Sequence, residues 1–166
     1  MITVNIPYFA PIAINCLDEE YPGELELRGE QVRLDLNFER DWIAAQKLEP
    51  VRKMVGRLVS MDQKSMVCLH KDYMDKDSTI VRYYLQYLLE NVWRPTLQKR
   101  VDFLSPTISP MDQLFQLFRL ERVGFYPEKE EWMAVFDYFI DARYSESVIA
   151  MHYSHEGKLI EILMHN

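Results

Sequence analysis

The spacing of apolar residues changes twice along this chain, and those changes constrain its fold more than any other feature. Apolar and polar residues alternate over residues 24–37, apolar residues recur at helical spacing between residues 51 and 92, and alternation returns from Leu120 onward. A period of two is typical of a half-buried strand, and a period of 3.6 is typical of an amphipathic helix. The order of strands, helices and strands therefore predicts an α+β fold.

Residues 24–37 have the pattern of a β-hairpin. With Gly29 and Glu30 at the centre of the turn, glycine comes first, as a type II′ turn prefers, and Leu27 faces Val32. One face of this hairpin is apolar and consists of Leu25, Leu27, Val32, Leu34 and Leu36. Because a slip of one residue would turn this whole face to water, we expect a firm register.

The central segment contains several helix-start signals. Pro50 fits the first helical position of one helix, and residues 60–63 (Ser-Met-Asp-Gln) have the pattern of a capping box that begins a second helix at about 61–74. Asp77 is the expected N-cap of a third helix. Ser109, followed by proline and an acid in the first turn, predicts the start of a short fourth helix.

The C-terminal part predicts four strands, at residues 120–126, 132–140, 147–153 and 158–164. A four-residue loop joins the last two strands, pairing Tyr153 with Lys158 and Met151 with Ile160. Short connections favour antiparallel neighbours. We therefore expect a single domain, residues 1–166, whose antiparallel sheet combines the N-terminal hairpin with a C-terminal four-strand meander and whose central helices pack on one face. Two separate domains are the alternative.

Composition limits the compartment and the partners. Nineteen basic residues against 26 acidic ones give a net charge of −7, which argues against sequence-independent binding of nucleic acid. No apolar run approaches the ~18 residues of a membrane helix, and no basic residue precedes Arg28, as a signal peptide would require. Cys16 and Cys68 are expected to be free and mostly buried. These features predict a cytoplasmic protein that does not bind membranes.

The sequence lacks the common chemical motifs. The five glycines are isolated, which excludes a P-loop or a dinucleotide fingerprint. Cys68 has no histidine on its own helical face, and His152 and His155 are expected to diverge as exposed rings rather than bind a metal. Asp137 and Glu161 are a candidate acid pair on neighbouring strands, but an outward, solvent-facing position explains both. We therefore predict no catalytic residue, no cofactor and no metal ligand.

Aromatic residues on the third helix are the best candidates for a binding surface. Tyr83 and Tyr87 are one turn apart, and Trp93 follows on the same non-core side. Exposed aromatic rings often mark protein interfaces. The alternative is that the helix is covered on two sides and the rings belong to the core. Acidic stretches at residues 18–20 and 128–131 would steer a basic partner, or would be ordinary solvated loops.

The C-terminal strands resemble a known family. Residues 148–162, preceded by Phe136-Asp137-Tyr138, resemble the end of an uncharacterised bacterial family known as a domain of unknown function. Its members have a strand, an acidic-Gly turn and a closing strand with a central Glu, whereas this chain has Ser154-His155 in the turn. The resemblance implies an α+β fold and assigns no activity or functional residue.

Three functional hypotheses follow. The first is a non-catalytic bacterial cytosolic protein that binds another protein, with the acidic, motif-free profile of toxin-neutralising immunity proteins. The alternative is a small-molecule-binding protein or an enzyme of unrecognised type, with a pocket between sheet and helices that holds convergent titratable groups. The third is a homodimer formed through an exposed sheet edge or the same aromatic face.

Overall fold

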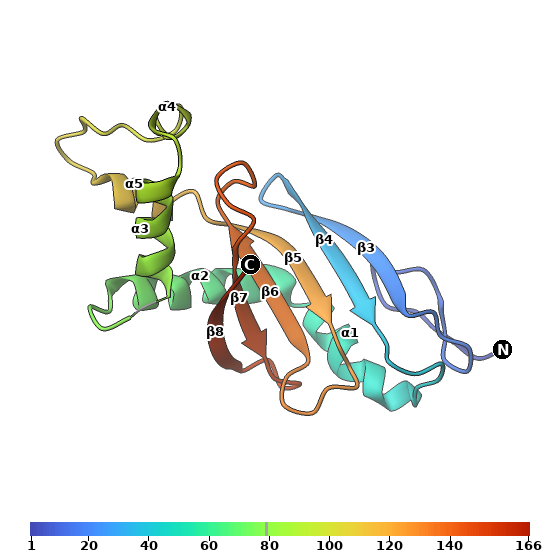
Figure 1. Cartoon of the computed structure of the whole chain (residues 1–166). Helices are drawn as coiled ribbons and strands as arrows, with labels where there is room; N and C mark the ends of the chain where they lie inside the picture. The colour runs from blue at the N-terminus through green and yellow to red at the C-terminus, as the bar shows by residue number, and fades with distance from the viewer. Residues whose placement is uncertain (79) are drawn as a thin grey trace.

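The molecule is built around a six-stranded sheet with helices behind it (Figure 1). The structure is a computed structural model that describes residues 1–78 and 80–166. The fold is α+β, and the N-terminal hairpin and the C-terminal strands share one sheet, as predicted. In spatial order the strands are Glu20–Leu27 (β3), Glu30–Asn37 (β4), Arg119–Phe125 (β5), Ala134–Phe139 (β6), Val148–Tyr153 (β7) and Leu159–His165 (β8). A small separate sheet pairs Thr3–Val4 (β1) with Ile12–Ala13 (β2).

The large sheet is mixed, so the prediction of a purely antiparallel sheet is wrong at one position. β4 and β5 run parallel, with Leu34 opposite Val123, whereas every other neighbouring pair in this sheet is antiparallel. A parallel pair needs a long crossover connection. The helical segment provides it, because it returns the chain to the end of the sheet from which β4 started.

The turn of the first hairpin also differs from the prediction. Arg28 and Gly29, not Gly29 and Glu30, occupy its centre, with φ of 52° and 77°, as a type I′ turn requires. Leu25 therefore pairs with Val32, and the predicted Leu27–Val32 pair is wrong. The register is displaced by two residues, so the apolar face still points to the core, because only an odd displacement would reverse it.

The last hairpin contains a bulge that gives it a different register from the predicted one. Tyr153 pairs with Leu159 and Met151 with Ile162, so the predicted pairs with Lys158 and Ile160 are wrong. Ile160 is the extra residue, and its side chain is exposed. Gly157 in the turn has a φ of 80°, which glycine adopts without steric cost.

The helical part begins with a 3₁₀ turn and continues through five α-helices. These are Ala45–Leu48 (η1), Glu49–Val55 (α1), Leu58–Met74 (α2), Val81–Asn91 (α3), Arg94–Leu97 (α4) and Pro110–Phe115 (α5). Among the described residues, no helix is long and apolar enough to cross a membrane.

Of the four predicted helix starts, two are wrong and one is confirmed, while Pro50 lies in the first turn of α1, which begins one residue earlier than predicted. α2 runs through Ser60 without a break, and Asp62 of the predicted capping box is buried in the core. The carboxylate of Asp72, not Asp77, accepts the N–H of Val81 at 3.0 Å, because the end of α2 brings it to the first turn of α3. Ser109 caps α5 as predicted.

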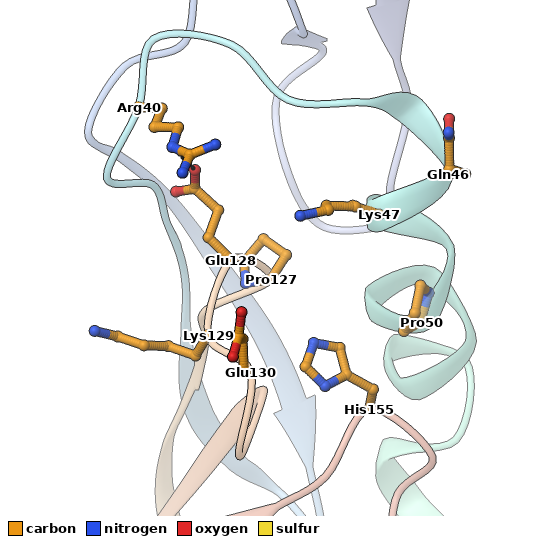
Figure 2. A pocket seen from close by; sticks show the side chains of 9 residues that line it. All are labelled: Arg40, Gln46, Lys47, Pro50, Pro127, Glu128, Lys129, Glu130 and His155. Carbon is orange, nitrogen blue, oxygen red and sulfur yellow. Dashed lines mark ion pairs between the residues drawn. The ribbon is translucent and has the colours of Figure 1, made fainter.

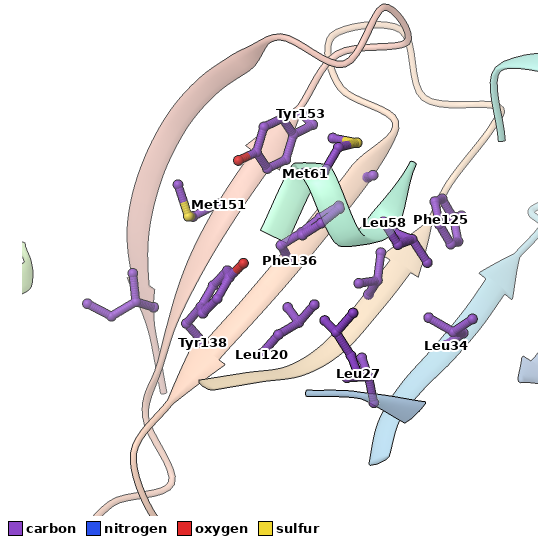
Figure 3. Close-up of a cluster of buried hydrophobic side chains, with 14 of the residues drawn as sticks. Leu27, Leu34, Leu58, Met61, Leu120, Phe125, Phe136, Tyr138, Met151 and Tyr153 are labelled. Carbon is purple, nitrogen blue, oxygen red and sulfur yellow. The ribbon is translucent and has the colours of Figure 1, made fainter. Parts of the chain in front are cut away.

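The core lies between α2 and one face of the sheet. Figure 1 shows α1 and α2 behind the sheet, whereas α3, α4 and α5 lie to one side of it. Figure 3 shows the sheet side chains grouped around the start of α2. The fully buried ones among them include Leu34, Phe125, Phe136, Tyr138 and Met151. The opposite face of the sheet, which we call the open face, carries the other residues of the strand alternation.

Candidate functional site

The three predicted aromatic residues are exposed on the folded chain. Tyr83, Tyr87 and Trp93 keep 54%, 42% and 74% of their surface in solvent, so the alternative that they belong to the core is wrong. The opposite side of α3 is fully buried through Val81, Tyr84, Leu85 and Leu88. We call Tyr83, Tyr87 and Trp93 the aromatic surface.

α3 is held firmly beneath this surface. Arg82 donates two hydrogen bonds to the Tyr73 carbonyl of α2, at 2.9 and 3.2 Å, and its guanidinium lies over the Tyr73 ring. The Tyr84 hydroxyl donates to the Ser147 carbonyl at 3.1 Å, and burial raises the pKa of Tyr84 to about 12. These contacts fix α3 to α2 and to the loop before β7, so Tyr83 and Tyr87 stand on a preorganised helix, and Trp93 lies just after its end.

A second group of side chains converges on the open face around Arg122. Its guanidinium donates to both Asp35 oxygens at 2.6 Å, to Asp137 Oδ2 at 3.0 Å and to the Tyr126 hydroxyl at 2.7 Å. Asn37 Nδ2 donates to Asp35 at 2.5 Å. We call these five residues the Arg122 cluster. It joins β4, β5 and β6 across the parallel pair.

The backbone is shaped to hold this arginine. A bulge at Glu121 turns both Arg119 and Arg122 toward the open face. A Cβ at Gly124 would lie 2.5 Å from Arg122 Nη2 and 2.9 Å from its Cζ, so only glycine leaves room for the guanidinium. Burial raises the pKa of Asp137 and outweighs the opposing effect of Arg122.

The Arg122 cluster is satisfied internally, and this limits its chemistry. Arginine has five N–H donors, and here they are directed to two carboxylates and a hydroxyl. Little donor capacity remains for an anionic ligand. The cluster therefore stabilises the pairing of β4, β5 and β6. It was not predicted from the sequence, because no motif indicates it.

Two histidines lie beside the cluster on the same face. His152 packs against Trp132 at 4.8 Å between ring centroids and stacks with His165 at 6.0 Å. His152 is buried, which contradicts the expected exposed ring, and burial lowers its pKa. Its Nδ1 lies 3.2 Å from Glu161 Oε1 but makes no well-aligned hydrogen bond with any residue that the structure describes. Glu161 thus contacts His152, whereas Asp137 contacts the arginine.

The cysteines and the metal prediction can be compared directly with the structure. Both cysteines are free, but Cys16 is exposed and Cys68 half-buried, so the prediction of mostly buried thiols is wrong. No group of three or more His, Cys, Asp or Glu side chains is placed to hold a metal ion within residues 1–78 and 80–166.

The hollow in Figure 2 lies at one end of the sheet. It measures about 510 Å³ and is lined by η1, the start of α1, and the loops at residues 127–130 and 155. Its charges are mixed, with Arg40 3.8 Å from Glu128. A smaller hollow of about 240 Å³ borders both the first hairpin and α2, where Arg28 pairs with the buried Asp62. It is smaller than most ligand sites.

Comparison with known proteins gives no match: no family model, no curated protein and no solved structure resembles this chain significantly. The resemblance of the C-terminal strands to an uncharacterised family therefore stays a prediction.

Proposed function

We propose that this chain is a non-catalytic protein of the bacterial cytosol that acts by binding another protein, in the way that immunity proteins neutralise a toxin. The observation that supports it is the aromatic surface. Tyr83 and Tyr87 remain exposed although the other side of α3 is completely buried, and Trp93, between α3 and α4, is exposed as well.

The physical character of this surface suits an interface. Tyrosine and tryptophan provide large contact areas and lose little side-chain entropy on binding, and they are enriched among the residues that dominate binding energy. Because Arg82 and Tyr84 already fix α3 in place, binding need not order the helix. The net charge of −7 favours a basic partner, through faster association.

The experiment compares two matched variants. Affinity capture from the source bacterium uses the wild-type chain, the variant Tyr83→Ser/Tyr87→Ser/Trp93→Ser, and a control in which the exposed rings of Tyr8 and Trp42 are replaced by serine. We expect a partner that the wild type and the control retain and the triple variant loses. Titration calorimetry with the purified partner should then show at least about hundredfold weaker binding for the triple variant. Equal affinity of all three chains would overturn the proposal.

A further inference from the structure

The two edges of the large sheet differ in how they are protected. β3 forms one edge and carries Pro22, which cannot donate to a neighbouring strand, together with the exposed acids Glu20, Glu24 and Glu26. The N-terminal segment also reaches it through a bridge from Phe9 to Gly23. Proline, charge and a covering segment are the usual means by which a sheet edge avoids further pairing.

β8 forms the other edge, and within the described residues it has neither a proline nor a covering segment. Within the described residues it pairs with β7 alone. Its sequence, Leu-Ile-Glu-Ile-Leu-Met-His, contains no proline and no lysine or arginine, and Glu161 is its only acid. Ile160 and Met164 keep 47% and 36% of their surface exposed. A long apolar edge of this kind is a template for another strand.

We infer that β8 pairs antiparallel with β8 of a second copy of this chain, so that two sheets join into one. A two-fold axis through Leu163 places each Leu163 opposite the partner's Leu163. Glu161 is then opposite the partner's His165, and Ile162 opposite the partner's Met164.

The strand's own pattern selects this register. Glu161, Leu163 and His165 lie on the open face, whereas Ile162 and Met164 lie on the face toward the helices. Centring on Leu163 therefore opposes acid with base on one face and apolar with apolar on the other, and the symmetry repeats each pair. Centring on Glu161 would oppose two acids, and centring on Ile162 would oppose Glu161 with a leucine.

Glu161 is free enough to make the new contact. Its side chain is 46% exposed while it lies beside His152, so it can accept from a second imidazole without leaving the first. The self-complementary pattern is the reason to assign the edge to a second copy rather than to an unrelated strand. This interface uses none of the residues of the aromatic surface.

The first test is the oligomeric state. Sedimentation equilibrium over a wide concentration range should show a monomer–dimer equilibrium for the wild type. Leu163→Lys places two lysines opposite each other only in the dimer, and we expect at least tenfold weaker association. Val67→Lys, at an exposed position of α2, is the matched control and should dimerise like the wild type. A wild-type chain that is monomeric throughout would overturn the proposal.

The second test addresses the register. Glu161→Lys should weaken the dimer, and Glu161→Lys/His165→Glu should restore it, because the exchange recreates both cross-strand pairs. Circular dichroism checks that each variant is folded. A double variant as weak as the single one would overturn the proposal. So would loss of the dimer in Tyr83→Ser/Tyr87→Ser/Trp93→Ser, because that variant leaves β8 unchanged.

Discussion

The two faces of the large sheet exclude water by different means. Phe125, Phe136 and Met151 point toward the helices and pack against α2 in an ordinary apolar core. On the open face, Val135 and Ala150 are 8% and 0% exposed although no helix covers them. On this face Arg122 bonds to Asp35 and Asp137, and His152 packs against Trp132, so polar and aromatic side chains that contact one another take the place of a helix.

The largest expected effect is on the helix-covered face. Phe136→Ala removes a fully buried ring and should lower the free energy of unfolding by about 3–5 kcal/mol. Val135→Ala, the neighbouring residue on the open face, should cost about 1–2 kcal/mol. Urea denaturation of both variants measures the difference. Equal costs would mean that the two faces are equally well packed.

Removal of the central cation should have the next largest effect. Arg122→Met leaves Asp35 and Asp137 mostly buried without their partner, and we expect a loss of about 2–4 kcal/mol. Replacing both acids by asparagine in the same chain should recover part of this loss, since no unpaired charge then remains. The same urea titrations measure it. If Arg122→Met left the free energy of unfolding unchanged, the cluster would be too hydrated to stabilise the pairing of the strands.

Filling the space beneath the arginine should cost less. Gly124→Ala forces the guanidinium away from its acceptors, and we expect a loss of about 1–3 kcal/mol. In the Arg122→Met background the same alanine should cost less, and a double-mutant cycle measures that coupling. If the costs of Gly124→Ala and Arg122→Met were additive, the alanine would destabilise the chain through backbone strain rather than through displacement of the arginine.

The pH dependence should be the smallest effect. Burial lowers the pKa of His152 below 6.5, so the unfolded chain takes up this proton first. The free energy of unfolding therefore falls as the pH drops below 6.5 and through the lowered pKa, by at most about 1.4 kcal/mol per pH unit.

A variant separates this histidine from its neighbours. His152→Gln should flatten the slope over the same range in urea titrations at stepped pH. Asp137 acts in the opposite direction, because its raised pKa gives stability that is lost as the pH rises through it. A slope unchanged in His152→Gln would assign the titration to another group.

Local patterns predicted the strands, the apolar face of the first hairpin and the aromatic surface. They failed where tertiary contacts decide. Alternation predicts which face Leu27 occupies, but that face is the same in the predicted and the observed register. The type of turn therefore determines whether Leu25 or Leu27 pairs with Val32. The Arg122 cluster could not be predicted, because Asp35 and Arg122 meet only through the parallel pairing of β4 with β5. Residues 60–63 were mistaken for a capping box because their local pattern says nothing about Arg28 or Tyr138, both of which contact the buried Asp62.

The parallel pairing of β4 with β5 has a consequence for synthesis of the chain. The β3–β4 hairpin leaves the ribosome long before residues 119–125 have been synthesised. Until then β4, which carries Val32, Leu34 and Leu36, has no strand to pair with on its β5 side. Closing so long a loop is slow, because its entropy is lost before the pairing repays it. The unfinished chain is therefore expected to be more prone to aggregation than the finished one, and that risk falls when β5 pairs with β4.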